Sequence, residues 1–126
     1  MPQCIVSPAA EQDIEAILFW TEEQFGQEAR LRYEAILIQA IADLAEDATR
    51  PGSHNRPELA ASARTYHVRH SRNNVTLPVG RVKNPRHFLL YRVRDDGRLE
   101  ISRILHDSMD LEKHLPNEYR VVANDD

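Results

Sequence analysis

This sequence is short of cysteine, of long apolar runs and of the motifs that mark most enzyme active sites. Its single cysteine, Cys4, excludes an internal disulfide and is typical of a reducing compartment. No apolar run reaches the length of a membrane span, and the N-terminal residues lack the basic start and apolar core of a signal peptide. We therefore expect a cytoplasmic protein with no membrane partner. A glycine-rich phosphate loop, an HExxH motif and a nucleophile elbow are also absent, which argues against metal or nucleophilic catalysis.

Histidine is the one potential metal ligand present in number, and the six copies are His54, His67, His70, His87, His106 and His114. His67 and His70 have a spacing that occurs in metal sites, but on a strand they point to opposite faces. No cysteine partner or adjacent carboxylate supports them. We expect neither a bound metal nor a cofactor.

Charge is distributed unevenly along the 126 residues. Residues 1–63 carry a net charge of −7, residues 64–103 carry +7 and residues 104–126 carry −4. This split predicts that the basic segment meets an acidic partner, either a protein segment or nucleic acid. The alternative is that these charges only solvate exposed faces. Hydrophobic residues make up 41% and charged residues 29%, which is typical of one soluble globular domain spanning 1–126.

The first half of the chain predicts a short strand followed by two helices. Residues 4–6 form a short apolar run, and Ser7-Pro8 then combines an N-cap residue with proline at the first helical position. Apolar residues recur at helical spacing as far as Phe25, with Trp20 beside the stripe, and Gly26 ends the helix. The second helix, about 27–47, is apolar over more than half its circumference and needs cover on two sides. These helices are expected to form an antiparallel hairpin lying on a sheet.

The second half predicts strands separated by loops. Residues 49–57 and 70–86 are rich in proline, glycine and asparagine and are expected to be loops, whereas 64–69 alternates like a strand. A β-hairpin follows within 88–105, and Asp107 or Asp110 caps a short final helix through Leu115, which Pro116 ends. The order of elements predicts an α+β domain: an N-terminal strand, a helical hairpin on one face of a small antiparallel sheet, and a short C-terminal helix.

The hairpin is defined by Asp96-Gly97, a strong turn signal between two runs rich in β-branched and aromatic residues. A two-residue loop there places Arg92 opposite Ile101, with Arg92 and Arg103 as diagonal neighbours on one face. Two arginines in that arrangement are within reach of one bound anion or carboxylate.

Two sets of side chains are candidates for function. Arg64, Arg69, Arg92 and Arg103 have the chemistry to bind phosphate or to pair with carboxylates, those of the helices and tail included. His106, followed by Asp107 and Asp110, carries an imidazole, a side chain suited to acid–base chemistry. The alternative for His106 is that it packs at the strand end and hydrogen-bonds a local carboxylate.

The chain resembles the ParE branch of the RelE/ParE superfamily, the toxins of type II bacterial toxin–antitoxin modules. The resemblance rests on the helical hairpin that starts at Pro8, on residues 85–93 (PRHFLLYRV) and on residues 101–106 (ISRILH) followed by Asp110. It implies a helical hairpin covering a twisted antiparallel sheet. It also implies a cognate antitoxin that wraps the toxin with a flexible, acidic, amphipathic segment. ParE-type toxins poison DNA gyrase, whereas RelE-type toxins cut mRNA on the ribosome.

Two departures from the ribonuclease branch favour ParE. Phe88 stands where that branch typically carries an arginine, and Leu105 and His106 end the last strand with no tyrosine before Tyr119. The resemblance therefore implies a non-enzymatic gyrase inhibitor that binds no nucleic acid sequence-specifically and is neutralised by a ParD-like antitoxin. The expected antitoxin-binding residues are Arg64, Arg69, Arg92 and Arg103. One alternative is a RelE-like mRNA endonuclease using Arg92, Arg103 and His106. Another is a degenerate, non-toxic member that only binds an antitoxin.

Overall fold

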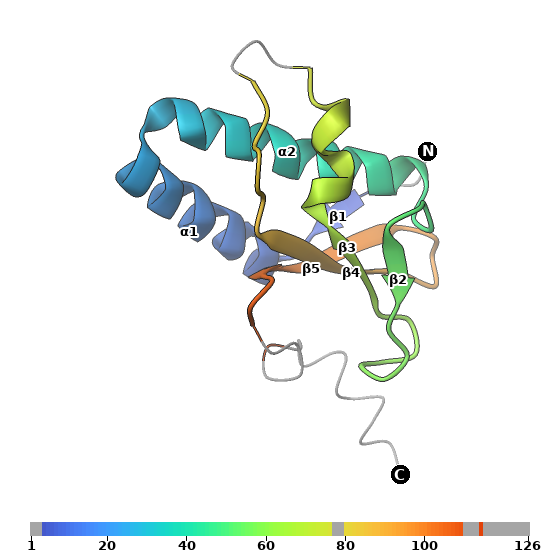
Figure 1. Cartoon of the computed structure of the whole chain (residues 1–126). Helices are drawn as coiled ribbons and strands as arrows, with labels where there is room; N and C mark the ends of the chain where they lie inside the picture. The colour runs from blue at the N-terminus through green and yellow to red at the C-terminus, as the bar shows by residue number, and fades with distance from the viewer. Residues whose placement is uncertain (1–3, 77–79, 110–113, 115–126) are drawn as a thin grey trace.

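A helical hairpin covers one face of a five-stranded sheet in the computed structural model, which describes residues 4–76, 80–109 and 114 (Figure 1). This confirms the predicted fold class. The predicted final helix through Leu115 falls almost wholly outside the described residues. In chain order the elements are β1 (Cys4–Val6), α1 (Pro8–Phe25), α2 (Gln27–Glu46), β2 (Ser53–Asn55), β3 (Arg64–His67), the 3₁₀ helix η1 (Val68–Asn74), β4 (His87–Val93) and β5 (Leu99–His106).

Local signals set the ends of the two helices as predicted. The Ser7 hydroxyl accepts a hydrogen bond from the Ala10 amide at 3.1 Å, and Pro8 opens α1. Gly26, at φ +94°, ends α1 and lets the chain reverse directly into α2. None of the helices within the described ranges is long and apolar enough to cross a membrane.

The sheet has the strand order β1-β5-β4-β3-β2 and is mixed. Neighbouring strands are antiparallel except β1, which pairs in parallel with β5 from Cys4 opposite Leu99 to Val6 opposite Ile101. The expectation of a wholly antiparallel sheet is therefore wrong for this strand. The chain after β1 continues into the helical hairpin, and β1 pairs with β5, the last strand. No short turn joins these two strands, so the sequence does not fix the direction of β1 relative to β5. Sequence reasoning also missed β2, because three polar residues carry no alternating pattern.

The main core lies between the helices and one face of the sheet. From the helices, Ile36, Leu37 and Leu44 are at most 2% exposed. They meet buried sheet residues, namely Tyr66, Leu89, Tyr91, Leu99, Ile101 and Ile104. Each such aliphatic side chain stabilises the fold by about 1.5–3 kcal/mol relative to full exposure. A second, smaller cluster of buried apolar side chains is separate from this core and consists of Leu59, Ala63 and Leu90.

The β4–β5 hairpin differs from the predicted one by a single residue. The Arg94 amide donates to the Arg98 carbonyl at 2.8 Å, so the loop is residues 95–97, with Gly97 at φ +84°. Arg92 consequently faces Glu100 and not Ile101, which corrects the predicted register. A bulge at Ser102 then restores the predicted pairing of Leu90 with Arg103.

The 3₁₀ helix η1 takes residues 68 and 69 from the predicted strand and residues 70–74 from the predicted loop, and it packs against α2. The buried Asp43 carboxylate of α2 accepts hydrogen bonds from the Ser71 hydroxyl at 2.6 Å and the Asn74 amide at 3.0 Å, and pairs with Arg50 at 3.3 Å. Burial opposes ionisation, but these hydrogen bonds and the charge of Arg50 hold the pKa of Asp43 below its usual value. Asp43 thus attaches η1 to the polar side of α2.

Candidate functional site

The four arginines expected to bind an antitoxin do not converge on one site. Arg64 donates to the Ser53 hydroxyl at 2.8 Å and to the Tyr91 hydroxyl at 3.3 Å. Arg92 lies 3.4 Å from the carboxylate of Glu100, the residue that the corrected register places opposite it. These contacts tie neighbouring strands and loops together.

Arg103 holds α1 to the sheet. Its guanidinium donates two hydrogen bonds to Asp13 of α1, at 2.8 and 3.0 Å, and the same carboxylate accepts the Ile104 amide at 2.9 Å. The pairing of β1 with β5 ends at Ile101. Past that point, the Asp13 carboxylate accepts the Ile104 amide of β5 in place of a neighbouring strand. Arg69, in contrast, is exposed, and within the described residues its side chain has no recorded hydrogen bond or ion pair. Of the four predicted arginines, Arg69 is exposed and the other three are partly buried.

His106 lies in a cluster at the end of the sheet. The Tyr33 hydroxyl accepts the Arg86 amide at 3.0 Å and hydrogen-bonds His87 Nδ1 at 2.5 Å. The His87 ring packs edge-on against His106, with ring centroids 5.3 Å apart. Burial, reinforced by His106, lowers the pKa of His87 to about 4, so His87 is neutral near pH 7.

Asp107 completes this cluster as an acceptor for two cationic or polar neighbours. Arg86 donates to both of its oxygens, and His67 Nε2 lies 3.1 Å from Oδ2. The hydrogen bonds from Arg86, with a further one from His67, lower the pKa of Asp107 to about 2. Because His67 Nδ1 also accepts the Arg69 amide at 3.1 Å, both ring nitrogens of His67 are engaged.

The His106 side chain itself makes only local hydrogen bonds among the described residues. Its Nδ1 accepts the Ser108 amide at 3.1 Å, and its side chain is 36% exposed. Arg92 and Arg103, predicted to act beside it in a ribonuclease, are held by Glu100 and Asp13. These contacts are better suited to stabilising the end of the sheet than to binding a phosphate. Within the described residues, no group of three or more potential ligands is arranged to hold a metal ion.

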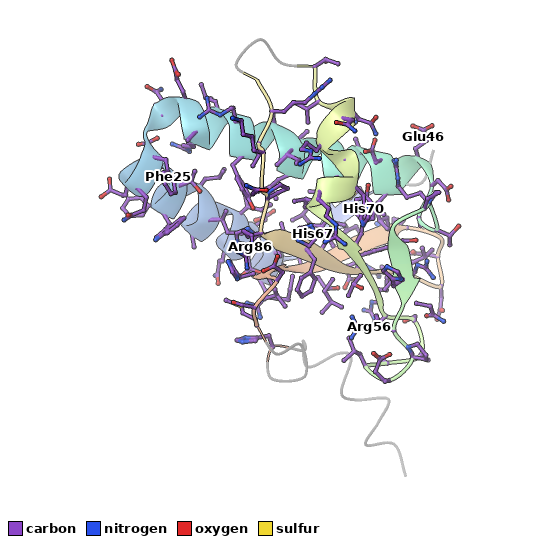
Figure 2. All side chains as sticks on the ribbon, in the orientation of Figure 1. Phe25, Glu46, Arg56, His67, His70 and Arg86 are labelled. Atoms are coloured by element: carbon purple, nitrogen blue, oxygen red, sulfur yellow. The ribbon has the colours of Figure 1, made fainter. Side chains whose placement is uncertain are left out.

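A large cavity opens beside this cluster and was not expected from the sequence. It has a volume of about 1230 Å³ and lies between α1, α2, residues 80–86 and the end of β5. Its aromatic wall includes Trp20 and Phe25, which are 57% and 67% exposed and pack edge-to-face with centroids 5.7 Å apart. Phe25 thus leaves the buried stripe to which helical spacing assigned it, and Figure 2 shows it at the tip of the helical hairpin. We call this cavity the hairpin groove.

The rim of the hairpin groove is basic. The described residues that line it include four cationic side chains, Arg32, Arg81, Lys83 and Arg86, and no carboxylate. Among the described residues, Arg81 donates to the neutral carbonyls of Val75 and Asn73, which leave its charge in place. An apolar floor with a cationic rim suits an amphipathic helix that carries acidic residues along one side.

Comparison with protein families agrees with this geometry. Residues 4–111 match the model of the family described as "ParE toxin of type II toxin-antitoxin system, parDE". The match includes all the helices and strands described above. None of the curated proteins compared with the chain matches it.

Proposed function

Because the chain belongs to the ParE toxin family of type II toxin–antitoxin systems, we propose that it inhibits DNA gyrase by direct binding and that a ParD-like antitoxin neutralises it. The toxin acts in this proposal as a binding protein in the cytoplasm, with no reaction of its own. Membership of the family implies an antitoxin partner, and the hairpin groove supports a particular place for that partner.

The hairpin groove is the observation that supports an antitoxin-binding site at this place. It joins exposed apolar side chains to a basic rim that has no carboxylate among its described lining residues, although one of its four cations, Arg86, is paired with Asp107. Exposed aromatic side chains gathered in a groove are typical of an interaction site. An acidic amphipathic segment would bury Trp20 and Phe25 under its apolar side and place its carboxylates near Arg81 and Lys83. Because these cations lie at the rim, their pairing with the segment chiefly accelerates association and weakens with salt.

Substitution of Trp20 tests this docking site. Trp20→Ala removes an exposed aromatic anchor, and we expect at least about 2 kcal/mol of lost binding, or about 30-fold in Kd, for the antitoxin of the module. Phe19→Ala is the matched control, since Phe19 is 69% exposed on the same helix but does not line the hairpin groove. Isothermal titration of both variants measures the difference. Equal affinities for the two variants would place the antitoxin elsewhere.

Gyrase inhibition is tested separately with the purified toxin. We expect it to block supercoiling of relaxed plasmid by gyrase, and addition of the antitoxin to restore the activity. Supercoiling that continues at a large excess of toxin would refute the gyrase target while leaving the antitoxin site untouched.

Message cleavage is the second function to be distinguished. In cells that express the toxin, gyrase poisoning predicts DNA-damage signalling with intact mRNA. Rapid loss of message that disappears in a His106→Ala variant would instead support an endonuclease. The engagement of Arg92 with Glu100 and of Arg103 with Asp13 favours inhibition by binding, since neither guanidinium is left to hold a scissile phosphate.

A further inference from the structure

A smaller pocket with a volume of about 270 Å³ lies against strands β2, β3 and β4, and it shares only Met109 with the described lining of the hairpin groove. Strand register explains which side chains meet there. His54 of β2 pairs with Thr65 of β3, and His67, two residues further along β3, pairs with Phe88 of β4. Residues two apart on a strand share a face, so these side chains form adjacent rows on one side of the sheet. We call this site the sheet pocket.

The sheet pocket is lined by basic side chains around one aromatic ring. Arg56 and Arg69 contribute guanidinium groups, and His70 joins them from η1. Figure 2 shows His67 and His70 at the junction of β3 with η1, and Arg56 at the turn that follows β2. Arg56 donates to Glu58 at 2.7 Å, whereas the exposed Arg69 has no such recorded partner among the described residues.

Among the described residues, Asp107 is the one acid that lines the sheet pocket, and its charge is already neutralised. Asp107 accepts hydrogen bonds from Arg86 and pairs with His67, so it opposes an incoming anion only weakly. The positive field also acts on the neighbouring histidines. Burial, followed by the charge of Arg69, lowers the pKa of His70. An anion bound beside Arg69 would relieve this repulsion.

We propose that the sheet pocket binds single-stranded nucleic acid, with one phosphate on Arg69 and one base against Phe88. A carboxylate would satisfy Arg69 but would leave the face of Phe88 without a stacking partner. A duplex offers no unstacked base to a pocket of this size. An aromatic ring on the face of a sheet, bordered by cations, is the combination that holds an unpaired base and its backbone without reading sequence. Arg69 was predicted to bind the antitoxin, but it does not line the hairpin groove, so this proposal does not rest on the proposed gyrase and antitoxin interactions.

Binding is measured by fluorescence anisotropy with the full chain and labelled oligothymidylate and oligouridylate of about 12 nucleotides. Arg69→Glu is expected to weaken binding about tenfold or more and to lower the slope of log affinity against log salt by about one. Arg30→Glu is the matched control, because Arg30 is 45% exposed on α2 and lines neither cavity. It is expected to change affinity less than threefold, by about the effect of net charge alone.

Phe88 is tested with a variant that preserves packing. Phe88→Leu keeps an apolar side chain but removes the aromatic face, and we expect a loss of about tenfold with an unchanged thermal unfolding midpoint. Failure of both oligonucleotides to bind at about 50 mM salt would overturn the proposal. Equal losses for Arg69→Glu and Arg30→Glu would overturn it too, since attraction would then be non-specific. Tighter, Arg69-dependent binding of a polyglutamate peptide would identify a carboxylate site instead.

Discussion

Replacing Asp13 by asparagine should reveal what the ion pair with Arg103 contributes to the fold. The Asp13 carboxylate accepts two guanidinium hydrogen bonds and the Ile104 amide, all between 2.8 and 3.0 Å. The two side chains are only 16% and 25% exposed, so solvent replaces these bonds poorly. Removing one partner of a fully buried pair costs about 3–5 kcal/mol, and the partial exposure here reduces that to about 2–3 kcal/mol for Asp13→Asn. Urea unfolding near neutral pH measures the loss of free energy.

A double-mutant cycle separates pairing from other effects of these substitutions. Arg103→Met should cost a similar amount, and the double variant should show a coupling of about 2 kcal/mol. Asp96→Asn is the surface control, because its pair with Arg98 is over 40% exposed on both sides and should contribute no more than about 1 kcal/mol. Additive losses for Asp13 and Arg103, or a loss below about 0.5 kcal/mol for Asp13→Asn, would refute the reasoning.

Three further predictions concern stability. The pKa of His87 is lowered to about 4, below its unfolded value, so between about pH 6.5 and 4 the unfolded chain binds a proton that the folded chain does not. The free energy of unfolding should therefore decrease by up to about 3 kcal/mol as the pH falls across that window. Urea unfolding midpoints that stay constant with pH would contradict this. Gly52→Ala should destabilise the fold by about 2 kcal/mol or more, because the new Cβ would lie 2.6 Å from the His70 ring and the φ of +96° is strained for alanine. Gly97→Ala is the control, since its Cβ would meet nothing within 4 Å and should cost only about 1 kcal/mol. Equal shifts of the thermal unfolding midpoint for the two variants would exclude the clash. Asp43→Ala should cost about 3 kcal/mol and release η1, which hydrogen exchange detects as faster exchange of residues 68–74; unchanged protection would argue against its anchoring role.

The ion pair with Asp13 also affects how antitoxin contacts are mapped. Arg103 was predicted to bind the antitoxin, but its guanidinium joins α1 to β5. A loss of antitoxin affinity in an Arg103 variant would therefore need a stability measurement before it is read as a lost contact. Trp20 is a cleaner probe of the antitoxin site, because it is 57% exposed and lines the hairpin groove.

Sequence patterns anticipated those features that depend on near neighbours in the chain. The cap at Ser7, the stop at Gly26 and one buried face on each helix follow from local spacings, and they appear in the structure. The prediction that α2 is covered on two sides is wrong at Leu31 and Ile38, which are 40% and 62% exposed. The hairpin was placed correctly but its loop was one residue too short. A dipeptide such as Asp96-Gly97 marks a turn without fixing its length, and the bulge at Ser102 leaves no sign in the alternating pattern.

The amino-acid sequence by itself determined the α+β class, the helical hairpin, the main strands and the resemblance to ParE toxins. Local periodicity and capping encode which face of an element is apolar, and a family pattern summarises many such positions. Only the tertiary structure decided which polar groups meet. Asp13 and Arg103 are 90 residues apart in the chain, and Tyr33 and His87 are 54 apart. The hairpin groove and the sheet pocket likewise arise where separate elements become neighbours. Partners at such distances depend on strand order, on the parallel pairing of β1 and on the register after the bulge, which no local pattern specifies.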